Sequence, residues 1–519
     1  MKENIKKEKC WNWLADAVFY EIYPQSFQDT NGDGVGDIPG MIKRLDYIKE
    51  LGCNAIWVNP WYDSPFGDAG YDVRNYKKIA PRYGTNEDAA RFFEQAHERG
   101  FHILIDLVPG HTAIDHEWFK SSMRAEKNEY TDRYIWTDSI WESGGEAATL
   151  RGISDRDGSA IVNFFSHQPA LNYGYAHPDQ PWKLAVHSPA ALATREAIKD
   201  VMRFWLDMGA DGFRVDMAAS LIKEDDIGHP ANIRLWQDFR AFLEKEYPHC
   251  VMISEWGVPK ESIAGGFHMD FMLHFGPPAY TSLFRSEYPF FSKEGKGDIT
   301  AFLDTYLEDL ASTEGKGLIC IPSGNHDMPR LARGRDMRDL KICFTFLLTM
   351  PGAPFLYYGD EIGMRYLEGL TSVEGGYNRT GSRSPMQWER KTGFGFTSSA
   401  DSYIPFDKGN DVPTVADQQR DKTSLLHTVK QLLALRKTHK ALQSFGVFTP
   451  LYAEKGKYPF VYERKAEGER IVIVLNPADR AEEIPFPLKG QVLFSVGGLP
   501  EDRKVPACSA AVFFEKTEK

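Results

Sequence analysis

One unit recurs along most of the chain: an amphipathic helix, then a glycine, then a short apolar strand that ends in polar residues. Residues 41–51, 86–99 and 190–208 carry apolar side chains at helical spacing. A glycine follows each of these segments: Gly52, Gly100 and Gly209. Glycine after a helix takes the left-handed conformation that turns the chain back. Continuous apolar strands separated by helices indicate a parallel sheet that is covered on both faces.

Eight such strands can be counted. They begin at residues 17, 54, 101, 211, 250, 269, 317 and 353. Eight strands predict a (β/α)₈ TIM barrel rather than an open, doubly wound sheet. The open sheet would usually carry a glycine-rich turn after its first strand, and GxGxxG is absent there.

Two departures from the repeat predict the domain organisation. The third and fourth strands begin at residues 101 and 211, so a subdomain must be inserted after the third strand. After a long helix over 423–442 the apolar period changes from helical to alternating, which predicts an antiparallel β domain with a hairpin at Glu467-Gly468. The predicted domains are a first barrel part (1–106), the inserted subdomain (107–180), a second barrel part (181–445) and a C-terminal β-sandwich-like domain (446–519).

Composition excludes several classes of protein. Hydrophobic residues make up 42% and charged residues 26%, as in ordinary globular proteins. Lys and Arg number 61 against 73 Asp and Glu, and the net charge of -12 repels phosphate backbones and anionic lipids. We therefore expect neither a nucleic-acid nor a membrane partner. Six cysteines without a CxxC pair, and no apolar segment near the N-terminus, predict reduced thiols in a cytoplasmic protein, with export as the minor alternative.

The polar residues at the strand ends are unusually acidic: Asp106, Asp216, Glu255 and Asp327. A single carboxylate in such a place is more often a structural partner of an arginine or an amide. Four that converge on one barrel mouth repel one another, a cost that a fold rarely retains without a use. Since no His/Cys set has zinc spacing and no phosphate loop is visible, the carboxylates favour glycoside hydrolysis.

Four motifs stand in order on these strands: DLVPGH (106–111), GFRVD (212–216), SEW (254–256) and NHD (325–327). Together they resemble the α-amylase superfamily of retaining α-glucoside enzymes, glycoside hydrolase family 13. The resemblance covers nearly the whole chain. It is closest to the branch of exo-α-glucosidases and oligo-1,6-glucosidases.

This resemblance implies a role for each motif residue. Asp216 would be the nucleophile and Arg214 would keep it ionised. Glu255 would be the general acid and then the general base. Asp327 would hold sugar hydroxyls and favour the distorted ring. Two histidines would also donate hydrogen bonds to the same glucose, although a structural imidazole is the alternative for each: His111 and His326.

The branch also suggests how the substrate pocket is closed. Asp68 would pair with Arg383, which precedes PMQW, and the pair would close the pocket around one glucose. Tyr71 would be the stacking platform beneath that ring. A closed pocket favours short substrates, that is, disaccharides or oligosaccharides, over starch.

A loop rich in Asp, Asn and Gly, QDTNGDGVGD, follows the first strand. Its oxygen-bearing side chains resemble half of a calcium loop, although such runs are also plain turns. The family resemblance adds one backbone carbonyl as a ligand. We expect a structural Ca²⁺ or Mg²⁺, and no organic cofactor. The ligands would be Asp29, Asn31, Asp33, Val35 and Asp37.

Three residues depart from the family pattern: Gly110 stands where Asn is usual, Ala170 interrupts QPDLN, and Met217 follows the nucleophile. Linkage preference is therefore not readable. The leading hypothesis is a retaining hydrolase that releases glucose from the non-reducing end of short α-glucosides through a covalent glucosyl-enzyme. The alternative is a transferring or isomerising enzyme of the trehalose synthase or sucrose isomerase type. A catalytically silent interaction protein is the third possibility. The oligomeric state is left open.

Overall fold

The computed structural model describes residues 12–145, 147–275 and 278–516. Its centre is an eight-stranded parallel sheet in the order β11-β10-β9-β8-β5-β2-β1-β12. A parallel bridge between Pro322 and Phe355 joins the two outer strands, and the Ser323 N–H donates to the Phe355 carbonyl at 2.9 Å. The predicted barrel is thereby confirmed. Its strands are β1 (Phe19–Ile22), β2 (Ala55–Val58), β5 (His102–Leu107), β8 (Gly212–Val215), β9 (Val251–Ser254), β10 (Met269–Phe271), β11 (Leu318–Cys320) and β12 (Phe355–Tyr357).

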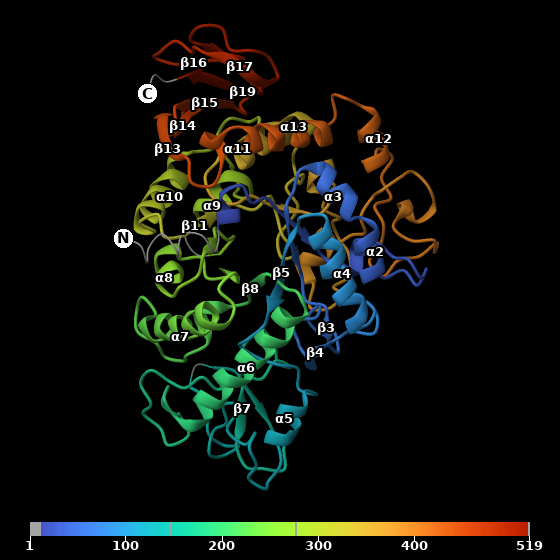
Figure 1. The fold of residues 1–519 in the computed structure, drawn as a ribbon, viewed down its shortest axis with the longest axis vertical. Helices are drawn as coiled ribbons and strands as arrows, with labels where there is room; N and C mark the ends of the chain where they lie inside the picture. Colours follow the sequence, from blue (N-terminus) through green and yellow to red (C-terminus); the bar gives the residue numbers. More distant parts are fainter. Residues whose placement is uncertain (1–11, 146, 276–277, 517–519) are drawn as a thin grey trace.

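Helices surround this sheet, as Figure 1 shows. They include α2 (Ile38–Lys43), α3 (Leu45–Leu51), α4 (Asn86–Glu98), α6 (Pro189–Met208), α7 (Pro230–Glu246), α8 (Pro259–Ala264), α9 (Ala279–Phe284), α10 (Thr300–Ser312), α11 (Met337–Thr349), α12 (Val415–Arg420) and α13 (Leu425–Thr438). The helix predicted over 41–51 is in fact two helices, divided at Arg44 (φ -105°, ψ 3°). The glycine after α6 is left-handed as expected: Gly209 has φ 127°, and a Cβ there would lie 2.9 Å from the Cβ of Phe93.

The barrel interior is filled by its own apolar side chains. Phe19 and Phe355 stack with ring centroids 4.3 Å apart, and Trp57 and Phe271 pack beside them. Because these rings fill the interior, a ligand can enter only at an end of the barrel.

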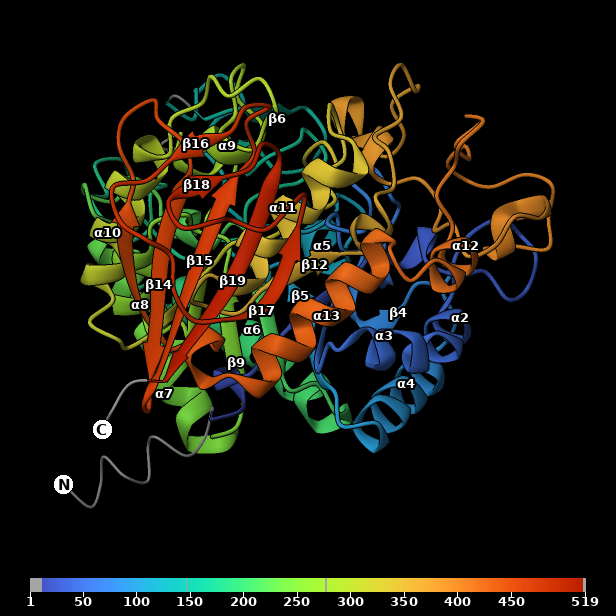
Figure 2. The ribbon, with the colours of Figure 1, turned by 90° about the horizontal axis from the view of Figure 1, so that it is seen from above.

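Two further regions flank the barrel at opposite ends of the molecule (Figure 1). The insertion between β5 and α6 holds α5 (Glu117–Ser122), β6 (Thr149–Arg151) and β7 (Ser159–Ile161). The C-terminal sheet lies over α11 and α13 (Figure 2), in the antiparallel order β13 (Val447–Tyr452), β14 (Phe460–Ala466), β15 (Glu469–Asn476), β19 (Ser509–Lys516) and β17 (Gln491–Val496). Its predicted hairpin turns where expected, with positive φ at Glu467 (42°) and Gly468 (82°).

Membrane-spanning helices and cysteine pairing can be assessed for the described residues alone. None of the described helices has both the length and the apolar character to cross a bilayer. Five buried cysteines are free thiols: Cys53, Cys250, Cys320, Cys343 and Cys508. Cys10 lies outside the described residues.

Candidate active site

Six of the nine predicted catalytic and substrate-binding residues line a cavity of about 480 Å³ at the carboxyl ends of the strands, and Arg214, His326 and Arg383 are buried beside it. We call it the strand-end cavity. Asp216 directly follows β8, Glu255 directly follows β9, and Asp327 lies in the loop after β11. The cavity is also lined by Asp68, Tyr71 and His111, which come from the loops after β2 and β5.

Arg214 is the centre of the charge network beneath this cavity. Its Nη1 lies 2.6 Å from Asp106 and 3.1 Å from Asp216, and its Nη2 lies 2.9 Å from Glu255. The guanidinium is 2% exposed, so these ion pairs are shielded from water. One planar cation thereby holds three carboxylates that would otherwise repel one another.

Asp216 and Glu255 form a coupled pair. Burial and the neighbouring Glu255 carboxylate raise the pKa of Asp216 well above its usual range, although the Arg214 guanidinium opposes the shift. Asp216 therefore holds a proton more tightly than a free carboxyl does. A carboxyl whose pKa is raised by its surroundings is a recurring feature of acid–base sites.

Met217 fixes one side of that pair. Its backbone is left-handed (φ 43°, ψ 43°), and its N–H donates to Glu255 Oε2 at 3.0 Å. This conformation is unusual for a residue with a side chain, and it places the thioether on the cavity wall. Met217, one of the three residues that depart from the family pattern, therefore lines the cavity.

Asp327 is held by two arginines and a histidine. Arg379 Nη1 lies 2.7 Å from its Oδ1, Arg383 Nη2 lies 3.1 Å from the same oxygen, and His326 Nε2 lies 3.3 Å from Oδ2. Burial would raise the pKa of Asp327, but these three neighbours outweigh it and lower that pKa. Asp327 is thus an anion under all ordinary conditions.

His326 stacks on Tyr71 (ring centroids 5.3 Å apart), and its Nε2 lies 2.8 Å from the Tyr71 hydroxyl. Its Nδ1 lies 3.0 Å from the buried Glu21 and 3.2 Å from the Asn59 amide. Burial lowers the pKa of His326 to about 3, so the ring is neutral at physiological pH.

The pocket-closing pair differs from the one expected. Asp68 pairs with Arg379, whose Nη2 lies 3.2 Å from its Oδ1, rather than with Arg383. Arg383 is buried instead beneath the cavity, where its Nε donates to the His326 carbonyl at 2.8 Å. The two arginines are four residues apart, and a 3₁₀ turn over Tyr377–Ser382 directs only the first one to Asp68.

Comparison with known proteins fits this geometry. A family model described as the α-amylase catalytic domain matches residues 21–444. The chain belongs to the α-amylase family. It is therefore an enzyme of α-glucosides.

Its relatives within the α-amylase family include hydrolases and synthases. The trehalose synthase/amylase TreS of Mycolicibacterium smegmatis is 31% identical over 502 residues, which cover 85% of this chain and 78% of the relative. The oligo-1,6-glucosidase of Parageobacillus thermoglucosidasius is 30% identical over 539 residues, with 92% of each chain covered. The crystal structure of the α-glucosyl transfer enzyme XgtA has a TM-score of 0.80 at 26% identity, covering 97% of this chain and 99% of that one.

Sequence reasoning missed two residues that position His111 in this α-amylase family site. The Asn163 amide nitrogen lies 3.0 Å from His111 Nδ1, and Lys223 Nζ donates to Asn163 Oδ1 at 2.8 Å. Because the amide nitrogen is a donor, Nδ1 accepts, and the ring proton sits on Nε2. That atom is buried and has no side-chain hydrogen-bond partner among the described residues, and His111 as a whole lines the cavity.

Gly110 explains why Asn163 can come so close. A Cβ on Gly110 would lie 2.9 Å from Asn163 Nδ2, so any larger side chain, including the usual Asn, would push the amide away from His111. Asn163 belongs to the insertion and Lys223 to the loop after β8. Only the position of the insertion over the barrel mouth brings them together.

The predicted metal loop lies apart from the strand-end cavity. Asp29 Oδ1 accepts the N–H groups of Asn31 (2.9 Å) and Gly32 (2.7 Å), and Asp37 Oδ1 accepts that of Gly40 at 2.7 Å, which caps α2. Asn31 Nδ2 donates to Asp33 Oδ2 at 3.1 Å. Across residues 12–145, 147–275 and 278–516, no three His, Cys, Asp or Glu side chains are grouped as around a metal ion. Asn31 and the Val35 carbonyl offer oxygens of a kind outside that set.

Proposed function

We propose that this chain is a retaining exo-α-glucosidase, which releases glucose from the non-reducing end of short α-glucosides. The observation that carries the proposal is the bridge from Asp68 through Arg379 to Asp327, with N–O distances of 3.2 and 2.7 Å. Asp68, Arg379 and Asp327 all line the cavity, and in this proposal their bridge closes its far end. A blocked end leaves room for one glucose and none for a longer chain on that side.

The chemistry follows from the two coupled carboxyls. Asp216 attacks the anomeric carbon while Glu255 protonates the departing oxygen, and a β-glucosyl ester forms. Glu255 then takes a proton from water, which attacks the ester and releases α-glucose with the starting configuration. Contact of both carboxyls with the single guanidinium of Arg214 supports the close spacing of retaining enzymes, about 5–5.5 Å, over the wider inverting one.

Asp327 and His111 bind the sugar in this proposal, and His326 has a positioning role. Asp327 stays ionised and accepts hydrogen bonds from hydroxyls. The neutral His111 donates through Nε2. His326, fixed between Tyr71 and Glu21, orients the platform beneath the ring.

One observation favours a second function, glucosyl transfer or isomerisation. The strand-end cavity is also lined by the apolar side chains of Phe164, Met217, Trp256 and Phe275. Apolar walls disfavour water beside the glucosyl-enzyme, and a sugar could then take its place as acceptor. The relatives described as a trehalose synthase/amylase and an α-glucosyl transfer enzyme are consistent with such transfer.

Product analysis separates the two functions. The wild type is incubated with maltose, isomaltose, sucrose and trehalose, and sugars are resolved by chromatography, with Asp216→Ala as the control. Free glucose as the main product, absent from the control, supports the hydrolase. Isomerised or lengthened sugars with little glucose would overturn it in favour of the transferase.

The proposal includes a structural divalent cation in the loop of residues 29–37. Asp29, Asn31, Asp33, Asp37 and the Val35 carbonyl would supply oxygen ligands, which suit Ca²⁺ or Mg²⁺. Each Asp33 oxygen accepts one hydrogen bond and keeps a second lone pair, whereas each Asp29 oxygen already accepts two, so Asp29 would exchange hydrogen bonds for the ion. A bound ion would brace this loop without entering the reaction.

Chelation tests the cation. We expect EDTA to lower the melting temperature of the wild type by several degrees, and excess Ca²⁺ or Mg²⁺ to restore it, because a ligand of the folded state stabilises it. Asp33→Asn should abolish that difference. An unchanged melting temperature, with no metal found by elemental analysis, would contradict the proposed site.

A further inference from the structure

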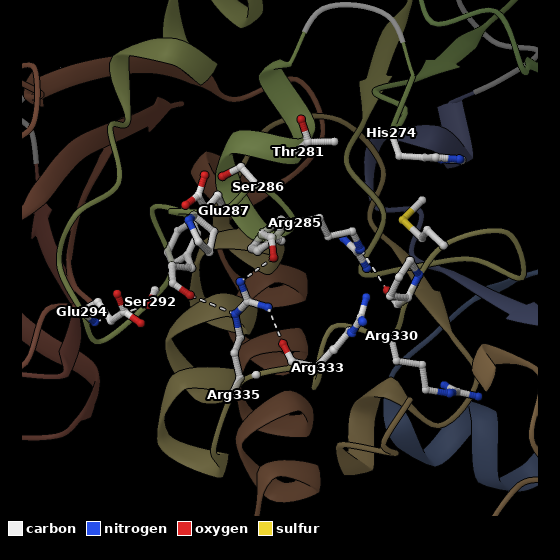
Figure 3. A pocket seen from close by; sticks show the side chains of 16 residues that line it. His274, Thr281, Arg285, Ser286, Glu287, Ser292, Glu294, Arg330, Arg333 and Arg335 are labelled. Carbon is white, nitrogen blue, oxygen red and sulfur yellow. Dashed lines mark hydrogen bonds between the residues drawn. The ribbon is translucent and has the colours of Figure 1, made fainter. Parts of the chain in front are cut away.

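A second cavity of about 480 Å³, drawn in Figure 3, shares the lining residue His274 with the first. We call it the arginine cavity, because four arginines line it: Arg285, Arg330, Arg333 and Arg335. They come from the end of α9 and from the segment that follows the NHD motif. No motif in the sequence pointed to this cavity.

Carboxylates neutralise only part of the positive charge of the arginine cavity. Arg330 pairs with Asp360 at 3.1 Å, and the exposed Arg333 pairs with Glu368 at 2.7 Å. Arg285 and Arg335 have no carboxylate within 4.0 Å among the residues that the structure describes.

Arg285 and Arg335 instead hold neutral oxygen atoms. Arg285 Nε donates to the Pro329 carbonyl at 2.9 Å and its Nη2 to the Ser323 carbonyl at 3.0 Å. Arg335 Nη2 donates to the Phe284 carbonyl at 2.7 Å. Burial lowers the pKa of Arg335, and the Arg285 guanidinium lowers it further, as expected for two cations without a counter-ion between them.

Acidic lining residues do not cancel this charge. The cavity has two of them, Glu287 and Glu294, and Glu294 is paired with Lys296 at 3.2 Å. Because Arg330 and Arg333 are paired with Asp360 and Glu368, the excess of positive charge comes from Arg285 and Arg335 against Glu287, in a chain whose net charge is -12. Figure 3 shows the Arg333 side chain directed from the lower edge toward the middle of the cavity.

The arginine cavity shares a wall with the strand-end cavity. His274 lines both. The arginine cavity is also lined by Met328 and Pro329, which directly follow Asp327. From that side, Arg285 donates a hydrogen bond to the Pro329 carbonyl. A ligand held by these arginines would therefore lie next to the departing sugar of the proposed reaction, or next to the segment that carries Asp327.

We propose that the arginine cavity binds the phosphoryl group of a sugar phosphate. Planar guanidinium forks match phosphate oxygens in geometry as well as in charge. The volume is far larger than inorganic phosphate needs, and the hydroxyls of Thr281, Ser286 and Ser292 on its wall suit a sugar. The phosphate belongs either to the leaving sugar of a phosphorylated α-glucoside or to a separate sugar phosphate.

Calorimetric titration of the full chain tests the binding. Glucose 6-phosphate, inorganic phosphate and glucose are titrated at constant ionic strength into the wild type and into Asp216→Asn. We expect saturable binding of glucose 6-phosphate to both proteins, tighter than that of either other probe. Because Asp216→Asn removes the chemistry, this result does not depend on the proposed glucosidase function.

Variants then place the ligand. Arg333→Gln should weaken binding about tenfold or more, the loss expected for one charged hydrogen bond. Arg390→Gln is the matched control, because its side chain is 54% exposed against 53% for Arg333 and is likewise paired with one carboxylate, Asp417. Arg285→Lys keeps the charge but removes the fork, and should also weaken binding.

Kinetics separates the two sources of the phosphate. A disaccharide phosphorylated on its leaving sugar should be cleaved with a higher kcat/KM than the neutral parent, with the advantage lost in Arg333→Gln, if the phosphate is part of the substrate. If it is a separate ligand, glucose 6-phosphate should change the rate on the neutral disaccharide. Absence of saturable binding, or binding unchanged in both Arg333→Gln and Arg285→Lys, would overturn the proposal.

Discussion

The strand-end cavity and the arginine cavity share His274 and have the same volume, but they differ in how their charges are paired. In the strand-end cavity, carboxylates meet arginines at 2.6–3.2 Å, so each acid has a fixed counter-ion. In the arginine cavity two of the four guanidinium groups hold only neutral oxygen atoms. The first arrangement fixes the positions of reacting groups, and the second leaves positive charge available for a ligand.

This difference shows two ways in which one molecule can accommodate closely spaced charges of the same sign. Repulsion among carboxylates is offset inside the strand-end cavity by Arg214 and Arg379, at the expense of any freedom to move. The arginine cavity is more open to solvent at Arg333, where water screens the charge. Variants that remove one charge from either cavity should therefore act on different properties.

The largest effect is expected for Asp216→Asn. Loss of the nucleophile should lower kcat by about 10⁴-fold or more on every α-glucoside. Because the change also removes the repulsion with Glu255, the melting temperature should stay at or above that of the wild type. Asp46→Asn, which alters an exposed carboxylate paired with Arg99, is the control for activity. Activity retained within tenfold would remove Asp216 from its proposed role.

The next effect separates two arginines that share Asp327. Arg379→Gln should lower kcat/KM on maltose by about 10- to 100-fold, the cost of lost charged hydrogen bonds, and should shift preference toward longer maltodextrins because the Asp68 bridge is opened. Arg383→Gln should lower kcat/KM without that shift, since Arg383 does not reach Asp68. The same chain-length preference in both variants would contradict the blocked-end interpretation.

A smaller effect concerns stability in acid. Burial lowers the pKa of His111 to about 3 in the folded chain, against about 6.5 when unfolded, so the unfolded state binds more protons between these values. The free energy of unfolding that the neutral His111 ring contributes is therefore lost as pH falls below about 6.5. The loss is on the order of 2 kcal/mol by pH 5. In urea unfolding, the free energy of unfolding should fall less between pH 7 and 5 for His111→Gln than for the wild type. For His249→Gln, which changes an exposed histidine, it should fall as much as for the wild type. Identical pH dependence in His111→Gln would contradict burial of a neutral ring.

The smallest effect is expected for Lys223→Gln. Loss of the amine frees Asn163, and His111 should then donate less well, with kcat/KM lower by about tenfold. Lys183→Gln, whose amine is likewise paired in this region but whose partners are Asp179 and Glu224, is the control. Equal effects of the two changes would indicate a general loss of stability.

Much of the fold could be predicted because apolar strands and the residues that end them are adjacent in sequence. Asp106, Asp216 and Glu255 stand within or directly after buried strands, so placing the strand places the carboxylate. The divided helix at Arg44 could not be predicted, because the periodicity of residues 41–51 continues across it.

The parts that escaped prediction depend on contacts between distant segments. A turn of 3₁₀ geometry decides whether Arg379 or Arg383 meets Asp68, and no local pattern separates them. Asn163 and Lys223 meet only because the insertion covers the barrel mouth. The arginine cavity joins two loops that the repeat does not describe, so its charge is visible only in three dimensions.

The measurement that tests the central claim most directly is the configuration of the first sugar released. Proton NMR spectra are recorded during the first minutes of maltose hydrolysis, before mutarotation mixes the anomers. Double displacement through Asp216 and Glu255 predicts that the non-reducing glucose appears as the α-anomer, with the β-anomer rising later. Initial release of β-glucose would show single displacement by water and would contradict the account.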